Sequence, residues 1–254
     1  MKVICICDHK GGVGKTATAG AIAQGINARK RPKGKTLLID TDPQGSATKT
    51  LYGVPGTTPG LYEVLKGRMD PTEAIIHTEA GDILPYSKEL SLLDAELAKA
   101  PGKDAYIKKK VIDPLMGQFT HIIIDTAPGL SVTMVQALTA SNGVIIPINS
   151  NADGVESLQE TYKTIETVKT YTNKELEILG AVITQHSGRA NVTRQYEELL
   201  EDVAKDLKVP LCKTRIRRSV IIDEARALRT NLFDYAPHAN VTKDYEALIK
   251  ELKL

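Results

Sequence analysis

Short apolar runs recur along the chain, and most of them are bounded by glycine, proline or acidic residues. Short runs rich in valine, isoleucine and leucine are typical of buried strands in a parallel sheet. The predicted strands are residues 3–7, 36–39, 82–85, 119–124, 143–148, 178–184 and 209–212. The segments between them carry apolar residues at helical spacing. The predicted helices are residues 17–28, 61–66, 91–98, 103–116, 155–170 and 193–207.

Strands that alternate with helices in this way predict an α/β fold. We expect a doubly wound, mostly parallel twisted sheet with helices on both faces, joined by right-handed crossovers. A chain of 254 residues can bury a full core as a single domain, which would span residues 1–254. Two domains would also fit this length, but the pattern does not require them.

The first predicted strand leads into a glycine-rich turn and then into a helix. Gly11, Gly12 and Gly14 let successive N–H groups converge on one point, and the helix that begins near Lys15 adds its free amides there. This geometry predicts a phosphate-binding cup. Its residues are Lys10, Gly11, Gly12, Val13, Gly14, Lys15, Thr16 and Ala17. Two alternatives are a glycine-rich turn that binds no nucleotide and an ordinary nucleotide kinase.

Lys15 and Thr16 carry the chemistry of this loop. A lysine at this position supplies a cation for the β- and γ-phosphate oxygens, and the following hydroxyl is a ligand for Mg²⁺. The usual spacing would put a glycine at position 9, where His9 stands, and Lys10 occupies the second position of the loop. This departure from the usual loop is informative, because a second lysine can neutralise charge at the leaving oxygen.

Acidic residues follow two other predicted strands. Asp40 and Asp42 come after residues 36–39, and Asp125 closes the run 119–124. The carboxyl ends of parallel strands meet at one edge of a sheet, so we expect these carboxylates to face the cup. An apolar strand that ends in an acid has the Walker B form, whose carboxylate meets Mg²⁺ through its water shell. A single aspartate could also merely cap a following helix.

Three segments resemble the motifs of the ParA/MinD superfamily of ATPases. Lys-Gly-Gly-Val-Gly-Lys-Thr at 10–16 resembles its deviant Walker A loop, in which the early lysine is the signature residue. Residues 38–48 resemble its switch I, and the turn 126–129 resembles its switch II. The resemblance covers nearly the whole chain and is strongest with the short ParA/Soj-type DNA partition ATPases, which lack an amino-terminal helix-turn-helix.

The resemblance implies ATP and Mg²⁺ as cofactors and assigns roles to particular residues. Lys10, Lys15 and Asp42 would be catalytic: Lys10 would cross to the γ-phosphate of a second subunit, and Asp42 would orient or deprotonate the attacking water. ATP would then lie within a homodimer interface. The implied metal residues are Thr16, Asp40 and Asp125.

Basic residues concentrate near the carboxyl end, where positions 213–229 hold six Lys or Arg and two acids. Residues 216–225 resemble the family segment that touches the adenine, so Arg218 is also assigned to the nucleotide. Two departures from that segment are Arg217 in place of a proline and Ile221 in place of an arginine that binds DNA in some members. Surface arginines paired with local acids are the alternative. The candidate DNA-binding residues are Arg189, Arg215, Arg217, Arg218, Arg226 and Arg229.

The function implied by the resemblance is DNA partition or segregation. Such an ATPase dimerises on ATP, binds double-stranded DNA nonspecifically and is released when a ParB-like partner stimulates hydrolysis. Alternatives are a MinD-like or cargo-positioning ATPase, a nucleotide-sensing regulator with little turnover, and a metabolic ligase-like member of the superfamily. The iron–sulfur reductase relatives are disfavoured, because no cysteine follows either switch.

Composition narrows the location and the partners. A net charge of +2 requires DNA binding to come from a local patch. No uninterrupted apolar run reaches the roughly 18 residues of a membrane span, and the chain enters a strand at once, so we expect a cytoplasmic, nucleoid-associated protein. The basic run 29–35 is expected to be a solvated turn. Residues 245–254 predict an amphipathic helix packed on the domain, which makes membrane binding the weaker alternative. The three cysteines predict no disulfide and no metal site.

Overall fold

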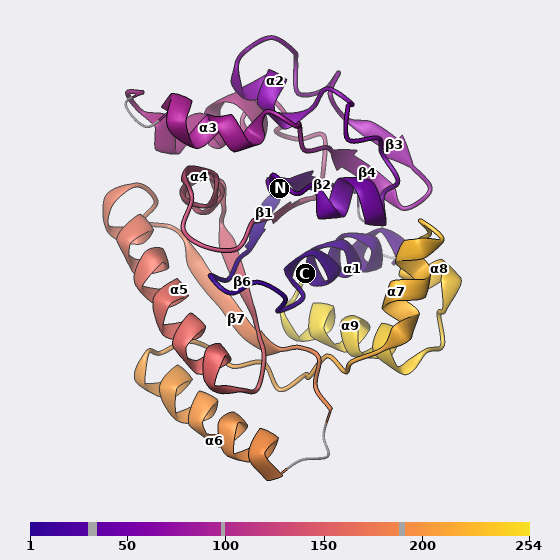
Figure 1. Cartoon of the computed structure of the whole chain (residues 1–254), viewed down its shortest axis with the longest axis vertical. Coiled ribbons are helices and arrows are strands. Elements are labelled where there is room, and N and C mark those ends of the chain that lie inside the picture. The colour runs from indigo at the N-terminus through magenta and orange to yellow at the C-terminus, as the bar shows by residue number, and fades with distance from the viewer. Residues whose placement is uncertain (30–34, 98–99, 188–190) are drawn as a thin grey trace.

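The computed structural model describes residues 1–29, 35–97, 100–187 and 191–254. Within these residues, seven strands form one sheet in the order β3-β4-β2-β5-β1-β6-β7 (Figure 1). Every neighbouring pair is parallel except β3 and β4, which are antiparallel. The strands are β1 (Lys2–Ile6), β2 (Thr36–Asp40), β3 (Ile76–Thr78), β4 (Gly81–Leu84), β5 (His121–Asp125), β6 (Gly143–Ile148) and β7 (Glu177–Ile183). The predicted α/β fold with a mostly parallel sheet is therefore confirmed.

Helices cover both faces of the sheet. The α-helices are α1 (Lys15–Ala28), α2 (Leu61–Leu65), α3 (Leu90–Leu97), α4 (Val132–Ala140), α5 (Ala152–Tyr171), α6 (Asn191–Asp206), α7 (Val220–Ala227), α8 (Leu232–Tyr235) and α9 (Asn240–Glu251). Two short π-helices, η1 (Ala47–Leu51) and η3 (Lys108–Ile112), and one short 3₁₀-helix, η2 (Lys103–Ala105), also occur in the described residues.

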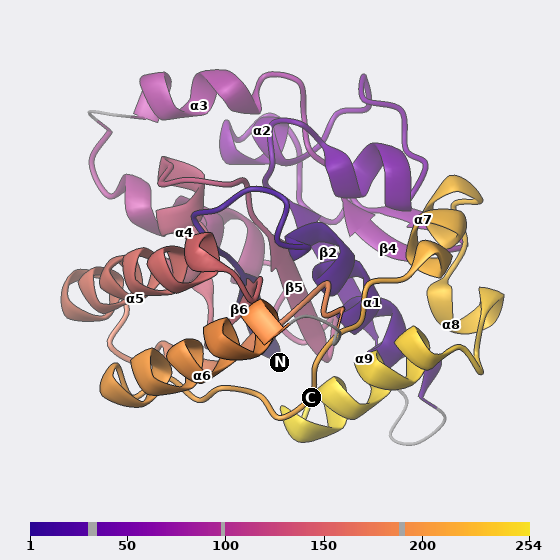
Figure 2. The same cartoon turned by 60° about the horizontal axis from the view of Figure 1, so that its bottom comes forward.

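The side chains of β1 alternate between two buried clusters, as the pleat of a strand requires. Ile4 and Ile6 pack with apolar residues of α1, α8 and α9 on one face. Val3 and Cys5 pack with residues of α2 to α6 on the other face. Figures 1 and 2 show α1 and α9 on one side of the sheet and α4 and α5 on the other. The central strand that leads into the phosphate loop is thus buried on both faces.

The carboxyl-terminal helix belongs to the core. On α9, Tyr245, Leu248 and Ile249 are buried against α1 and the sheet. The carboxylate of Glu251 accepts hydrogen bonds from the backbone N–H groups of Lys213 and Thr214 at 2.6 and 3.0 Å. The packing predicted for residues 245–254 is confirmed. Among the described residues, no helix combines the length and apolar character that a membrane crossing demands.

Two local predictions were partly wrong, and one strand was not predicted. The helix expected at 103–116 is helical only over 103–112, where η2 and η3 are joined by residues 106–107, and it ends early because Pro114 has no N–H for the next helical hydrogen bond. The strand expected at 209–212 makes only one bridge, from Leu211 to Ala181. β3 was not predicted, since its three residues are only partly buried. The basic run 29–35 lies mostly outside the described residues.

Candidate nucleotide site

The register of three central strands brings the phosphate loop and two carboxylates to one edge of the sheet. β1 pairs with β5 so that Ile6 lies opposite Asp125, and β2 pairs with β5 so that Asp40 lies opposite the same residue. The loop 8–14 leaves β1 immediately beyond this level. Asp40, Asp125 and the glycine-rich loop therefore meet where the sequence predicted.

The amino end of α1 forms the floor of the loop. The helix begins at Lys15 after Gly14, which offers no side chain to cap the first N–H groups, and its first turn contains no acid. Uncapped amides at a helix start attract anions. A pocket of about 430 Å³ opens over them. The predicted residues that line it are Gly11, Gly12, Gly14, Lys15, Thr16, Ala17, Asp42, Arg217, Arg218 and Arg226.

Lys15 lies almost fully buried inside the loop. Its Nζ donates to the carbonyl oxygens of Asp8 and Lys10 at 3.0 and 2.6 Å. Burial lowers the pKa of this ammonium, and the neighbouring carboxylates of Asp8 and Asp125 oppose that effect. The ammonium is thus held beside the amides of the cup, where a phosphate oxygen would meet it.

Asp125 is the group that most clearly lacks a partner. It is fully buried, and neither carboxylate oxygen has a hydrogen-bond partner among the described residues. Burial raises its pKa well above the usual value, the nearby Asp40 raises it further, and the Thr16 hydroxyl beside it lowers it in part. A buried carboxylate next to a threonine hydroxyl fits a divalent cation such as Mg²⁺. No cluster of three or more His, Cys, Asp or Glu suited to a metal occurs in the described part of the chain.

Asp40 is engaged differently from Asp125. One of its oxygens accepts from the N–H and hydroxyl of Thr48 at 2.8 and 2.7 Å, and the other accepts from the N–H of Asp42 at 3.1 Å. Burial nonetheless raises its pKa to about 6. Asp40 therefore joins the two ends of the turn 42–48, while the Asp42 side chain lines the pocket and accepts from the N–H of Gln44.

Asp8 is a buried acid of the site that the motif analysis missed. It is fully buried, accepts from the backbone N–H of Lys10, and accepts from the Ser157 hydroxyl at 3.1 Å. Burial raises its pKa to about 6, and the Lys10 N–H and the Lys15 ammonium lower it in part. The rule that selected Asp40 and Asp125, an acid directly after a strand, could have found it.

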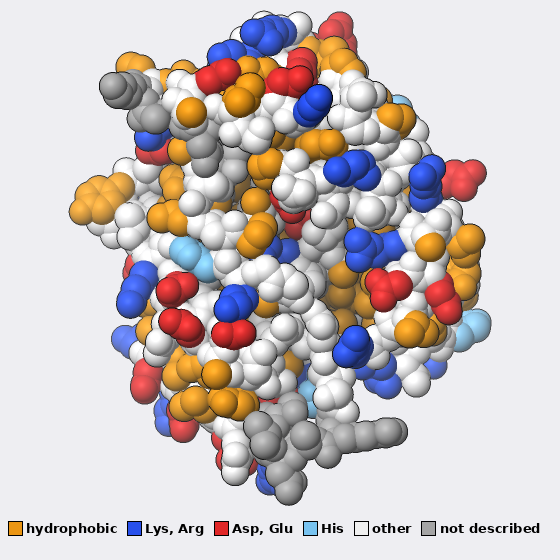
Figure 3. Space-filling model, viewed as in Figure 1, with side chains coloured by type: hydrophobic (Ala, Val, Ile, Leu, Met, Phe, Trp, Pro, Cys, Tyr) orange, Lys and Arg blue, Asp and Glu red, His pale blue; other side chains and the backbone are white. Residues whose placement is uncertain are grey.

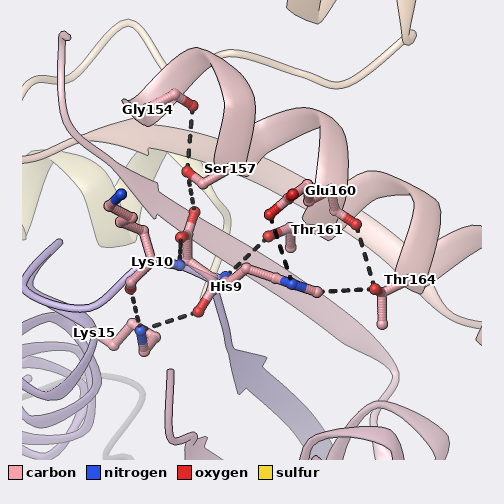
Figure 4. A network of polar contacts seen from close by, with 9 residues as sticks. His9, Lys10, Lys15, Gly154, Ser157, Glu160, Thr161 and Thr164 are labelled. Carbon is pink, nitrogen blue, oxygen red and sulfur yellow. Dashed lines mark hydrogen bonds and ion pairs between the residues drawn. The ribbon is translucent and has the colours of Figure 1, made fainter. Parts of the chain in front are cut away.

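Helix α5 lies along the first half of the loop (Figure 4). The Lys10 ammonium pairs with the Asp153 carboxylate at 3.0 Å, and both side chains are about half exposed. One helical turn further, Ser157 contacts Asp8. Residues four apart share a face of a helix, so one face of α5 contacts two loop residues. No local pattern in the sequence identified Asp153.

His9 extends this contact along the same helix. Its backbone N–H donates to the Thr161 hydroxyl at 3.2 Å, and its Nε2 lies 2.9 Å from the Thr164 hydroxyl. Burial lowers the pKa of the imidazole, while Glu160 opposes that effect. His9, in the place of the usual glycine, thus fixes the loop to α5.

The opposite end of the pocket is built by β7 and the segment before α7. Thr184 donates its hydroxyl to the Val13 carbonyl at 2.7 Å, and the Gln185 amide donates to the Gly12 carbonyl. Both residues follow β7, but they are not acids, so the rule that predicted site residues from acids after strands did not identify them. The remaining residues at this end are Ile216, Arg218, Ser219, Ile222 and Tyr245.

The five candidate DNA-binding arginines that the structure describes do not share one set of surroundings. Arg215 forms ion pairs with Glu197 and Glu201 at 3.6 and 3.5 Å. Arg217 forms a two-pronged pair with Asp244, at 2.6 and 2.8 Å. The alternative of arginines paired with local acids therefore applies to both.

Arg218 and Arg226 line the nucleotide pocket, as Arg217 does, and Arg226 also contacts Asp223 at 3.7 Å. Arg229 is exposed just beyond α7. Arg189 lies outside the described residues.

A parallel sheet with a phosphate loop after its central strand defines a P-loop nucleotide-binding protein. A protein-family model described as an AAA domain matches residues 1–178. The chain is 30% identical over 257 residues to the chromosome partitioning protein ParA of Myxococcus xanthus, covering 99% of this chain and 87% of that protein. The chain therefore belongs to the ParA/MinD superfamily of P-loop ATPases.

Two solved structures are similar over nearly their full length. Cobyrinic acid a,c-diamide synthase from Mycobacterium smegmatis, with a bound ATP analogue and magnesium, is 27% identical with a TM-score of 0.85, covering 98% of this chain and 93% of that chain. A plasmid partition protein described as putative, from Borrelia burgdorferi and bound to AMPPNP, is 26% identical with a TM-score of 0.81, covering 99% of this chain and 98% of that chain.

The buried Asp8 carboxylate predicts a pH dependence of stability. Its pKa is about 6 in the folded protein and 3.8 in the unfolded chain, so ionisation of Asp8 opposes folding. The contribution of Asp8 to the free energy of unfolding therefore falls as the pH rises from 3.8 to about 6. Asp8→Asn keeps an acceptor for the Lys10 N–H and removes the charge. We expect this variant to be more stable than the parent by about 1–3 kcal/mol at pH 7, with the difference vanishing near pH 4.

Urea unfolding followed by circular dichroism across this pH range measures the difference. The other buried acids are common to both proteins, so their effects cancel. If Asp8→Asn and the parent were equally stable at pH 7 as well as at pH 4, ionisation of Asp8 would not destabilise the folded protein.

Proposed function

We propose that this protein is an ATPase of DNA partition or segregation that cycles between an ATP-bound dimer and a released monomer. The observation that carries the proposal is the buried Asp125 carboxylate, without a geometric hydrogen-bond partner, beside an uncapped helix start; a second lysine, Lys10, lies in the same loop. The kinship with a chromosome partitioning protein supports the cellular role.

The nucleotide phosphates would bind to the amides of 11–16 and to the Lys15 ammonium. Mg²⁺ would be held by the Thr16 hydroxyl and the Asp125 carboxylate, and when bound it neutralises charge on the β- and γ-phosphate oxygens. Asp40 contributes indirectly, because its oxygens already bind Thr48 and Asp42. Arg218 would contact the nucleotide from the far end of the pocket.

Asp42 would orient the attacking water or accept its proton. Its carboxylate is almost buried in the pocket lining and is held by the turn that it forms with Gln44. A positioned base of this kind typically accelerates a reaction by about 10² to 10⁴.

Lys10 would act on a neighbouring subunit. Its side chain is about half exposed and its ammonium pairs with Asp153 of its own chain, so it must leave this partner to reach a γ-phosphate across an interface. Binding of ATP would then favour the homodimer by mass action, and hydrolysis would release it. Two copies of a weak basic surface bind duplex DNA more tightly than one. A ParB-like partner would set the rate of release, and the protein would reside on the nucleoid.

A metabolic ligase is the second candidate, favoured by the similarity to cobyrinic acid a,c-diamide synthase. The two functions differ in what accelerates ATP hydrolysis. Duplex DNA, together with a ParB-like partner, accelerates turnover in a partition ATPase, whereas a ligase responds to its acid and amine substrates. A steady-state ATPase assay with and without duplex DNA and partner separates them.

Lys10→Ala tests the role of the second lysine. Loss of the amine removes charge stabilisation from the transition state, so we expect hydrolysis to fall by about a thousandfold and the ATP-dependent dimer to disappear, while nucleotide binding persists. Light scattering with ADP and then with ATP, together with phosphate release, measures both effects. Asp153→Asn is the matched control: it breaks the same ion pair, keeps the amine, and should still dimerise. Unchanged turnover in Lys10→Ala would refute the role across the interface.

Asp42→Ala tests the positioned base. We expect hydrolysis to fall by about 100-fold or more while ATP-dependent dimers persist on duplex DNA, since the variant can assemble but not reset. Phosphate release and DNA co-sedimentation are the measurements. Asp42→Asn, which can keep the turn with Gln44, should be equally slow if the carboxylate is the base. Recovery of turnover in that variant would assign Asp42 a purely structural role.

A further inference from the structure

An open groove lies beside the nucleotide pocket, between η1 and α7. It encloses about 420 Å³. Its lining residues are Lys49, Thr50, Asp223, Arg226, Ala227 and Arg229. Figure 3 shows Lys and Arg side chains gathered over η1 and α7 on this face. Three cations against one acid are a strong local excess on a chain whose net charge is +2.

Lys49 is held in the groove by an aromatic ring and not by an acid. Its Nζ lies 5.0 Å from the centroid of the Tyr86 ring, a cation–π contact. The ring is itself fixed, because it packs so closely against Gly45 that a Cβ there would come within 2.2 Å of it. No acid lies within ion-pair distance of Lys49 among the described residues, so its ammonium retains donors for a ligand.

Arg229 reaches the same groove from the end of α7. It adopts a left-handed backbone conformation with φ of 55°, and its aliphatic stem lies on the backbone of Gly53, where a Cβ would be 2.5 Å from the Arg229 Cδ. The guanidinium has no acidic partner within the described part of the chain. Stem packing therefore positions a cation that nothing neutralises.

Arg226 joins the groove to the nucleotide pocket. Its Nη2 donates to the Thr50 hydroxyl at 3.0 Å, and that hydroxyl donates to the Ser46 carbonyl at 2.6 Å. Ser46, Asp223 and Arg226 all line the nucleotide pocket as well. The two walls of the groove are thus continuous with two walls of the pocket, η1 after the Asp42 turn and α7.

Two other candidate arginines and one family position are less available for DNA. Arg215 and Arg217 are paired with acids. Ile221, which stands where some family members have a DNA-binding arginine, is partly buried and packs against the core. The groove also contains Lys49, which the sequence analysis did not select.

We propose that this groove binds the phosphate backbone of duplex DNA through Lys49, Arg226 and Arg229. The proposal rests on the proposed function and names the site of the DNA partner. Contacts to phosphates carry affinity but no sequence information, as nonspecific binding requires. Arg226 lines both the groove and the nucleotide pocket, so a nucleotide that contacts Arg226 would couple the two sites.

The test compares two double variants that lose the same charge. Lys49→Gln with Arg229→Gln alters the groove, and Lys109→Gln with Lys163→Gln alters exposed lysines of η3 and α5. Fluorescence anisotropy of a labelled duplex is measured over a salt series, with protein loaded with Mg²⁺ and a non-hydrolysable ATP analogue. We expect the affinity of the groove variant for the duplex to be lower by about tenfold or more. The slope of log K against log salt should be shallower by about 0.9 for each DNA phosphate that is no longer neutralised.

The control pair should bind as the parent does, and equal affinity of both double variants overturns the proposal. Affinity for a fluorescent ATP analogue reports that the groove variant is folded, and Lys49→Gln alone, at an exposed position, should give a smaller loss in the same direction. If the parent and the groove variant bind the duplex equally well, the groove is refuted as the DNA site but the proposed function is not. If the parent binds no duplex, the proposed function is refuted as well. Displacement of the duplex by inorganic phosphate at constant ionic strength would assign the groove to free phosphate instead.

Discussion

The parallel pairing of β5 with both β1 and β2 is the constraint on which the site depends. It sets Ile6 and Asp40 level with Asp125, so the phosphate loop leaves β1 directly beside two buried carboxylates. Each of these strands is buried on both faces, which leaves little freedom for a shift in register. The position of the two carboxylates relative to the start of the phosphate loop is therefore set by the core.

The charges around the loop are unbalanced in the protein alone. Asp8, Asp40 and Asp125 are fully buried, and Lys15 is the buried ammonium among them. Burial raises the pKa of all three acids because no cation compensates them fully. A divalent cation would relieve this excess of negative charge, and a nucleotide polyphosphate without one would increase it. The electrostatics of the fold thus favour joint binding of metal and nucleotide.

Much of this arrangement could be predicted from the sequence, because apolar runs define buried parallel strands and the loop spacing is specific. The antiparallel β3 was missed since its few residues are half exposed, and the strand expected at 209–212 has at Pro210 a residue with no N–H for a ladder. Asp8 was within reach of the same rule that found Asp125. The contacts of α5 with the loop and the groove between η1 and α7 were not predictable, because each joins segments distant in the chain that no local spacing relates.

The ion pair between Lys10 and Asp153 has a consequence for reversibility. Both side chains are about half exposed, so water and salt weaken the attraction between them. Such a pair holds the amine only weakly, and it can re-form after it has been broken. In the proposed cycle, the nucleotide would then decide between dimer and monomer, because the resting contact would add little to the barrier in either direction.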